Sequence, residues 1–316
     1  MEHAIPQPER CLVLTNSRRR ADQEIAAASQ PQIKLRIADI VIRLVTCGLR
    51  EDIRIPRKFL PFVCDDAHDA DFDVQYGSVQ DAELGHRVFS AKQAWSVYER
   101  DDTLAFEVTR KLASPAAWAL LSPDLSSGRV VIADCVDHRN ALEHLLRGLL
   151  SRLLLIGLLS RNRGVMLHAS GVKIGTTGLL FAGEDGAGKS TMARLWAKYA
   201  NGTVIGDDHI VIRKRQSRYW MYSTPWHGMD CVASAVPIDS IFIIHHGTRN
   251  QLSQLTPAIA ATHLLKRSFP PHWSREGMHY SLQLLGQLCT AIPTYDFAFL
   301  PDRSAVDLLN ATLETV

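Results

Sequence analysis

One glycine-rich stretch combines residue types that bind phosphate. Its residues fit the pattern G-x-x-x-x-G-K-[ST] at every fixed position and continue into a threonine: Gly183, Glu184, Asp185, Gly186, Ala187, Gly188, Lys189, Ser190 and Thr191. The glycines permit tight turns, so successive backbone N–H groups can converge on phosphate oxygens. In such a loop Lys189 reaches the outer phosphates and the Ser190 hydroxyl ligates Mg²⁺. We therefore predict that Gly183–Thr191 binds ATP together with Mg²⁺, with Mn²⁺ as an alternative metal.

The segments on either side have the patterns of the elements that such a loop requires. Two apolar runs, residues 165–174 and 179–183, are joined by the turn GTTG, which predicts a β-hairpin whose second strand leads into the loop. Residues 191–200 have helical periodicity and end at Asn201-Gly202, a good helix C-cap. The loop is thus expected at a helix N-terminus, where unpaired N–H groups and the helix macrodipole favour anions.

Two adjacent acids follow the next apolar stretch. Asp207 and Asp208 come at the end of a predicted strand, where one carboxylate can hold the metal and the other can accept the proton of an attacking hydroxyl. A polar turn between two strands would also explain this pair. His168 lies in the strand that precedes the hairpin turn, and a lone histidine in a strand is more often a core residue than a catalytic one.

The rest of the chain divides by its pattern into four parts. Residues 1–30 are polar and are expected to form an N-terminal arm, and residues 31–136 contain short β-branched and aromatic segments typical of a β-rich domain. Ile33–Thr46 alternates like a strand with one buried face. Residues 137–160 have apolar side chains at helical spacing and are expected to be one connecting helix, which leaves 161–316 as the nucleotide-binding domain.

Composition excludes several classes of partner. The formal net charge is +2, so no global field attracts nucleic acid or an anionic membrane. The most apolar segment, residues 142–159, carries charged side chains that argue against a bilayer span. The six cysteines have no metal-ligand spacing, and the first ten residues lack the pattern of a secretory signal. We expect a cytoplasmic protein that binds neither nucleic acid nor membrane.

Three motifs, taken in order, resemble one family. MLHASGV, LLFAGEDGAGKST and VIGDDHIVI resemble the C-terminal domain of HPr serine kinase/phosphorylase and, more distantly, ATP-dependent phosphoenolpyruvate carboxykinase. The resemblance covers about residues 160–305. It implies an α/β (α+β) fold with a phosphate-binding-loop domain of this kind. The smaller β-rich domain that precedes it, residues 31–136, lies outside the resemblance and is expected to bind the acceptor.

The resemblance also implies roles for single residues. His168 corresponds to the histidine beside the metal and the catalytic acid, and Lys189 to the lysine that neutralises the transferred phosphate. Asp207 looks like the metal-associated carboxylate and Asp208 like the base, although the pattern also allows the reverse assignment. The chain departs from the HPr enzymes at Thr191, where they have an acid, and it lacks their second glycine-rich signature. It is most similar to the HPr-kinase-related proteins of bacterial peptide-modification clusters, including kinases of lasso-peptide precursors.

These observations predict an ATP-dependent serine kinase acting on a peptide or small protein, with Asp208, Asp207, His168 and Lys189 as catalytic residues and Ser190 and Asp207 at the metal. Trp226, His227, Arg267 and Arg275 are further candidates for acceptor or nucleotide binding. Two alternatives remain open at this point: a nucleotide-dependent switch without kinase activity, and a small-molecule kinase acting, for instance, on free serine. A homo-oligomer is also an open alternative.

Overall fold

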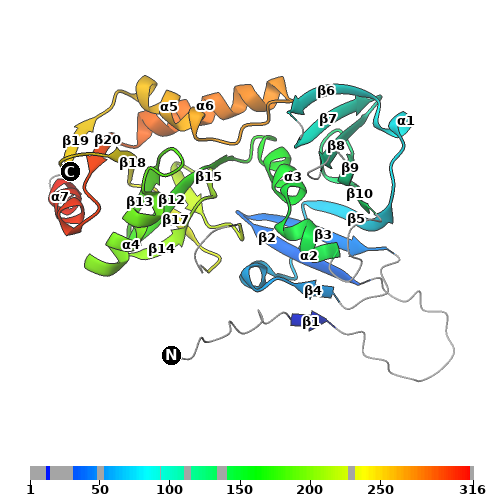
Figure 1. Cartoon of the computed structure of the whole chain (residues 1–316), viewed down its shortest axis with the longest axis horizontal. Helices are drawn as coiled ribbons and strands as arrows, with labels where there is room; N and C mark the ends of the chain where they lie inside the picture. Colours follow the sequence, from blue (N-terminus) through cyan, green and yellow to red (C-terminus); the bar gives the residue numbers. More distant parts are fainter. Residues whose placement is uncertain are drawn as a thin grey trace, which may run out of the picture. The chain divides into compact units, whose positions relative to one another are not determined.

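The chain folds into two compact units, seen in a computed structural model (Figure 1). The structure describes residues 12–14, 31–47, 53–92, 94–109, 115–133, 141–226 and 232–313. The units are Met1–Leu155 and Ile156–Val316, which have nearly equal lengths, and the boundary falls inside helix α3 (Leu149–Leu159). The fold class is mixed α/β with several sheets.

Unit 1 is built around a mixed sheet that has eight strands within its described residues. The strand order is β2-β3-β5-β10-β9-β8-β7-β6, with parallel pairing of β5 to β3 and to β10. Its elements are β1 (Leu12–Leu14), β2 (Gln32–Ile37), β3 (Ile40–Thr46), β4 (Ile53–Ile55), the 3-10 helix η1 (Arg57–Phe62), β5 (Ala70–Gly77), α1 (Asp81–Leu84), β6 (His86–Ala91), β7 (Trp95–Arg100), β8 (Thr103–Thr109), β9 (Pro115–Leu121), β10 (Ser127–Ala133) and α2 (Ala141–Arg147).

Three segments of unit 1 differ from the sequence-based expectation. The alternating segment Ile33–Thr46 is not one strand: β2 and β3 form a hairpin, because Ala38 and Asp39 both adopt positive φ and reverse the chain. Within the expected N-terminal arm, β1 pairs antiparallel with β4; the other residues of the arm lie outside the described part. Of the expected single helix over 137–160, residues 137–140 lie outside the described part, and the rest is two helices, α2 and α3. They are separated at Gly148, where the Ser151 hydroxyl lies within hydrogen-bond distance of the carbonyl oxygens of Leu146 and Gly148.

Unit 2 contains a six-stranded and a four-stranded sheet among its described residues. The larger has the order β14-β12-β13-β18-β20-β19, the smaller β11-β15-β16-β17. The elements are β11 (Val165–Leu167), β12 (Ala169–Ile174), β13 (Thr177–Ala182), α4 (Lys189–Tyr199), β14 (Thr203–Gly206), β15 (Ile210–Arg215), β16 (Arg218–Tyr222), β17 (Ala235–Pro237), β18 (Ser240–His246), β19 (Gln251–Gln254), α5 (Pro257–Lys266), α6 (Arg275–Ala291), β20 (Thr294–Phe299) and α7 (Arg303–Leu313).

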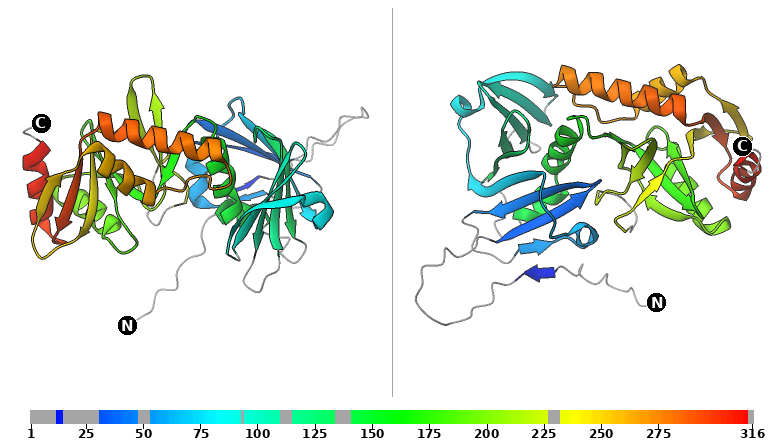
Figure 2. Two further views of the ribbon diagram at one scale, coloured as in Figure 1. Left: turned by 90° about the horizontal axis from the view of Figure 1, so that it is seen from above. Right: turned by 180° about the vertical axis from the view of Figure 1, so that it is seen from behind.

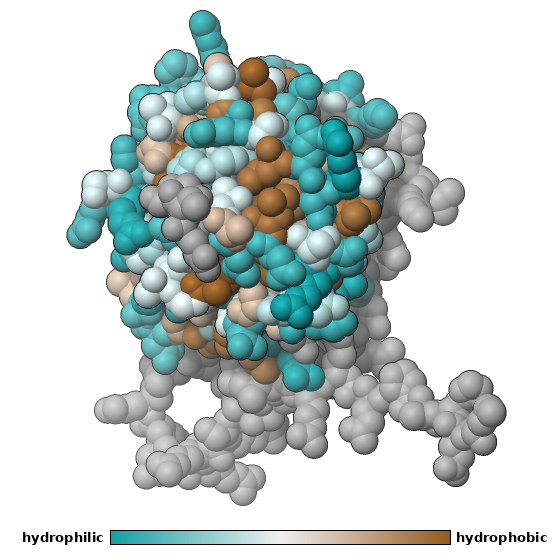
Figure 3. All heavy atoms as spheres, turned by 90° about the vertical axis from the view of Figure 1, so that its left-hand side faces the viewer, coloured by the Kyte–Doolittle hydropathy of each residue, from teal (hydrophilic) through white to brown (hydrophobic). Residues whose placement is uncertain are grey.

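The six-stranded sheet of unit 2 is covered on both faces, as its apolar strands require. Successive residues of β13 and β18 point to opposite faces, so Leu180 and Ile243 pack with α5 and α6 whereas Phe181 and Phe242 pack with α4 and α7. Figure 2 shows these two helical layers from further directions. On the side of unit 2 that carries α4 and α7, hydrophilic residues interrupt the hydrophobic areas of the surface (Figure 3). Among the described residues, no helix is both long enough and apolar enough to span a bilayer.

The register of the larger sheet brings three chain segments to one edge. Strand β12 runs antiparallel to both of its neighbours, with Ala169 opposite Ala182 of β13 and Gly171 opposite Gly206 of β14. The start of β12 therefore lies beside the end of β13 and the end of β14. Because His168 precedes β12 while the glycine-rich loop follows β13 and the two acids follow β14, these segments meet at the same edge.

Candidate functional site

The glycine-rich loop connects strand β13 to helix α4, as its pattern predicts. The strand ends at Ala182 and the helix begins at Lys189, with Gly188 as N-cap in a left-handed conformation, φ +94°. The first N–H groups of α4 donate to no side-chain cap, because the N-cap residue is a glycine. A glycine-rich turn ahead of such a helix end is an arrangement that binds phosphate.

Gly188 is required by both conformation and space. Its φ of +94° strains any residue with a Cβ, and a Cβ at this position would lie 2.7 Å from Cζ of Phe299. Phe299 is fully buried and packs in the core formed with α4 and α7, so its ring has no room to move away. The imidazole of His246 stacks on the same ring and its Nε2 donates to Gly186 O at 2.7 Å. Phe299 and His246 thus constrain the loop through their contacts with Gly188 and Gly186.

We expect Gly188→Ala to lower the free energy of unfolding by about 2–4 kcal/mol, because the left-handed strain and the contact with Phe299 add. The matched control is Gly175→Ala, in the β12–β13 turn, where φ is +56° but a Cβ would meet no atom within 4 Å. That change should cost only about 1 kcal/mol. Chemical denaturation of both variants measures the difference, and equal losses would show that Phe299 does not constrain the loop.

Lys189 is buried beneath the loop that it follows. Its side-chain Nζ donates to the carbonyl oxygens of Gly183 at 3.1 Å and Glu184 at 2.9 Å, so it closes the loop on itself. Burial lowers the pKa of Lys189, and the negative charges of nearby acids, with Asp185 contributing the most, oppose this change. A largely buried ammonium group that faces carbonyl oxygens can exchange these partners for phosphate oxygens.

Asp207 is buried and lies against the first turn of α4. Its Oδ1 accepts hydrogen bonds from Ser190 Oγ at 3.1 Å and from Ser170 Oγ at 2.5 Å. In the described part of the chain no group of three or more His, Cys, Asp or Glu side chains could hold a metal by itself. Mg²⁺ commonly takes one or two protein oxygens, with phosphate oxygens and water completing its shell. The Ser190–Asp207 pair fits that requirement.

Asp208 has the opposite environment, half exposed and held by histidine. Its backbone φ is +85°, an uncommon conformation for a residue other than glycine. Oδ1 lies 2.8 Å from Nε2 of His168, and Oδ2 lies 3.0 Å from Nδ1 of His209. These two hydrogen bonds, that from His168 first, hold the pKa of Asp208 well below its ordinary value. The carboxylate is therefore ionised at neutral pH and reaches solvent.

His168 is not inside one strand, contrary to the sequence-based expectation. The strand is interrupted at His168, which lies between β11 and β12, and these two strands belong to different sheets. The backbone N–H of His168 donates to Arg267 O at 2.7 Å. This break turns the imidazole toward the acids: Nε2 meets Asp208, and Nδ1 lies 3.4 Å from Oδ1 of Asp185. Apolar periodicity carries no signal for the break, because the residues on both sides are buried.

Ser170 and His209 lie within the quoted motifs but have no role in the sequence-based prediction. Arg267, a candidate for acceptor or nucleotide binding, is the C-cap residue of α5. The Arg267 side chain is 10% exposed and lies 3.6 Å from Oε1 of Glu184 in the loop. Ser170 has the correct strand parity to face Asp207, but that requires knowing the β12–β14 register. For His209, its position directly after Asp208 in the sequence is the one signal that could have indicated the contact between the two side chains.

The remaining sequence candidates have different outcomes. Trp226 is buried, and its backbone carbonyl contacts Nδ1 of His209. Arg275 begins α6 and is exposed. His227 lies outside the described residues. Thr191 is in the first turn of α4, where it is partly buried.

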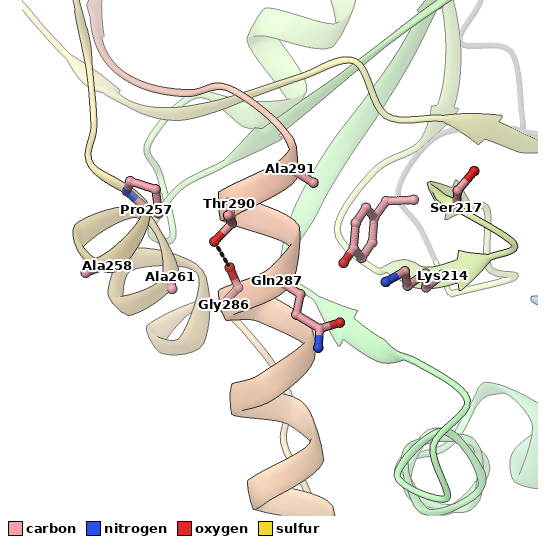
Figure 4. Close-up of a pocket in the computed structure, with 10 residues that line it drawn as sticks. Lys214, Ser217, Pro257, Ala258, Ala261, Gly286, Gln287, Thr290 and Ala291 are labelled. Carbon is pink, nitrogen blue, oxygen red and sulfur yellow. Dashed lines mark hydrogen bonds between the residues drawn. The ribbon is translucent and has the colours of Figure 1, made fainter.

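A pocket of about 660 Å³ lies elsewhere in unit 2, between the β15–β16 hairpin and helices α5 and α6 (Figure 4). It is lined by Lys214, Ser217, Tyr219, Pro257, Ala258, Ala261, Gly286, Gln287, Thr290 and Ala291. None of these residues belongs to the predicted phosphate site. The Thr290 hydroxyl donates its hydrogen bond to the carbonyl oxygen of Gly286. The candidate site is therefore the edge formed by the loop, His168 and the two acids.

Comparison with known proteins shows a distant structural likeness. No protein-family model matches the chain, and no curated protein matches it. Among solved structures, the chain is similar to the Hpr(Ser) kinase/phosphatase from Coxiella burnetii, with 12% identity and a TM-score of 0.29. The similarity covers 47% of this chain and 98% of that chain. The structural relationship between the two proteins is distant.

Proposed function

We propose that this protein is an ATP-dependent phosphotransferase that moves the terminal phosphoryl group of ATP to a hydroxyl group. The observation that carries the proposal is the meeting of two different carboxylates at the glycine-rich loop. Asp207 is buried and bonded to Ser190, the residue that the motif assigns to the metal. Asp208 is half exposed and bonded to His168. One acid is thus suited to the metal and the other to an acceptor.

Each residue has a role that follows from its surroundings. The loop amides and Lys189 bind and orient the triphosphate, and Lys189 offsets the charge of the transferred group. Bound Mg²⁺, held by Ser190 and Asp207, would supply further charge neutralisation. Asp208 accepts a hydrogen bond from the acceptor hydroxyl and takes its proton as the oxygen bonds to the terminal phosphorus. The bond from that phosphorus to the bridging oxygen then breaks, and ADP leaves.

For the acceptor we propose a serine on a peptide or small protein, including ribosomally made lasso-peptide precursors. This part of the proposal is supported by the order of the three sequence motifs and by the exposure of Asp208, whose carboxylate a large acceptor can reach. We also propose that the protein works in the cytoplasm and needs neither nucleic acid nor a membrane. Self-association of the chain is compatible with this function.

The test is a transfer assay with ATP labelled in its terminal phosphate. The full chain is incubated with Mg²⁺ and separately with serine-containing peptide libraries, with candidate precursor peptides and with free serine, and products are identified by mass spectrometry. A phosphoserine peptide is the expected product. Phosphorylation of free serine alone would identify a small-molecule kinase. Binding of ATP without any phosphorylated product would favour a nucleotide-dependent switch and contradict the proposal.

The metal requirement should change with the Ser190–Asp207 pair. We expect Ser190→Ala to raise the Mg²⁺ concentration for half-maximal activity by about tenfold or more, since one charge-assisted oxygen contact is worth about 1.5–3 kcal/mol. Removing all metal with a chelator should abolish transfer, and Mn²⁺ should restore it. Thr191→Ala, the neighbouring hydroxyl, is the matched control. An equal shift in both variants would argue against a specific role of Ser190.

We expect the guanidinium of Arg267 to leave the Glu184 carboxylate and bind the triphosphate when ATP enters the site. The Arg267 side chain is nearly buried, its Nε lacks a hydrogen-bond partner among the described residues, and its guanidinium faces Glu184. We expect Glu184→Gln to tighten MgATP binding by about twofold to fivefold, because an exposed carboxylate no longer competes with phosphate. Arg267→Gln should weaken it by about tenfold or more. Calorimetric titration measures both, and an unchanged affinity in the two variants would show that Arg267 is only structural.

A further inference from the structure

Asp208 lies between two imidazole rings, one on each carboxylate oxygen. His168 contacts Oδ1 at 2.8 Å and His209 contacts Oδ2 at 3.0 Å. One hydrogen bond leaves a carboxylate free to turn about its Cβ–Cγ bond, whereas two bonds on different oxygens define the plane of the group. The second contact is therefore more than a duplicate of the first.

The donor atom of His209 is determined by what surrounds it. Nδ1 faces Asp208 Oδ2 and also the carbonyl oxygen of Trp226 at 2.9 Å. A carbonyl oxygen only accepts hydrogen bonds, so Nδ1 carries the proton and shares it between the two oxygens. The contact to Asp208 is thus a directed N–H donation.

His209 is itself held in place from several sides. Its ring is buried and stacks on the ring of Phe269 with the centroids 5.1 Å apart and the planes 17° from parallel. The backbone carbonyl of His209 accepts from the hydroxyl of Thr224, which is fully buried. Because Asp208 is half exposed and has a positive φ, the fixed neighbour determines the carboxylate position rather than the reverse.

We propose that His209 is a positioning residue whose Nδ1–H group fixes the carboxylate plane of Asp208 and so directs a free lone pair of Asp208 toward the acceptor hydroxyl. This inference rests on the proposed phosphotransferase function. It assigns to His209 an effect on the transfer step and none on nucleotide binding, because the ring contacts Asp208 rather than the loop. A residue that only stabilised the fold would affect both or neither.

Three substitutions of His209 distinguish the effect of its Nδ1–H donor from the effect of its ring packing. His209→Asn places an amide N–H near the position of Nδ1, His209→Gln places it near Nε2, and His209→Phe keeps the stacking on Phe269 without any donor. We expect the Gln and Phe variants to lose about tenfold to a hundredfold in kcat, with KM for ATP changed by less than about threefold. The Asn variant should keep kcat within about threefold of the wild type.

The kinetics are measured on the full chain with the acceptor found in the transfer assay, after circular dichroism and MgATP titration have shown which variants fold. Wild-type kcat in the Gln variant, or equal losses in the Asn and Gln variants, would overturn the role of His209. Should His209→Phe not fold, the Asn and Gln pair still decides. If the wild type transfers no phosphoryl group at all, the phosphotransferase function fails, and this inference fails with it.

Discussion

We expect Asp208→Asn to lower kcat by about 10²- to 10⁴-fold while the affinity for MgATP stays within about threefold. The amide keeps the size of the side chain but cannot take the proton of an acceptor hydroxyl. Asp208 contacts histidines rather than the loop, so the nucleotide loses no partner. Asparagine also tolerates a positive φ, so the variant should keep the fold of the wild type. Single-turnover kinetics and calorimetric titration measure the two quantities.

The matched control is Asp207→Asn. Asp207 is bonded to Ser190 at the position proposed for the metal, so this change should raise the Mg²⁺ concentration needed for activity. If Asp208→Asn mainly alters the metal requirement and Asp207→Asn mainly alters kcat, then Asp207 is the base and Asp208 is the carboxylate at the metal. Retention of full activity in Asp208→Asn would contradict a base at this position.

Lys189→Met should lower kcat by about 10²- to 10³-fold and weaken MgATP binding by about tenfold or more. The ammonium group is largely buried and has two carbonyl partners in the loop, and phosphate oxygens can replace these partners. Methionine keeps the unbranched length of the side chain without its charge. Activity and binding are measured as for Asp208→Asn.

Lys198→Met is the control for that experiment, since Lys198 lies on the same helix, is exposed and contacts the ring of Tyr199. It should leave both quantities within about twofold of the wild type. If both lysine variants lose activity to the same degree, the effect comes from helix α4 as a whole and not from Lys189 at the loop.

Part of the fold follows from local sequence signals. The turn GTTG with apolar runs on both sides gave the β12–β13 hairpin, and the glycine-rich loop was correctly expected between a strand and a helix. The missed features are those where tertiary contacts override the local pattern. The reversal at Ala38-Asp39 has no glycine to mark it. The break at His168 lies between two buried strands, and a stable α2–α3 break depends on the Ser151 hydroxyl as well as on Gly148.

The candidate site shows the same division. Residues within a motif, such as Lys189 and Ser190, could be proposed because their types and spacing are tied to phosphate binding. Arg267 could be named as a candidate for nucleotide or acceptor binding, but its contact with Glu184 could not, because that contact joins segments that are distant in the sequence. The two acids could be proposed as a pair, but their separate environments depend on the packing of Asp207 against α4.

A crystal structure of the protein with Mn²⁺ and a non-hydrolysable ATP analogue would show where the nucleotide and the metal bind. Anomalous scattering should locate Mn²⁺ in coordination contact with Ser190 and next to Asp207. The terminal phosphate should lie between the ammonium group of Lys189 and the carboxylate of Asp208. A nucleotide bound elsewhere, such as in the pocket beside Tyr219, or a triphosphate that does not contact the loop, would contradict the phosphotransferase account.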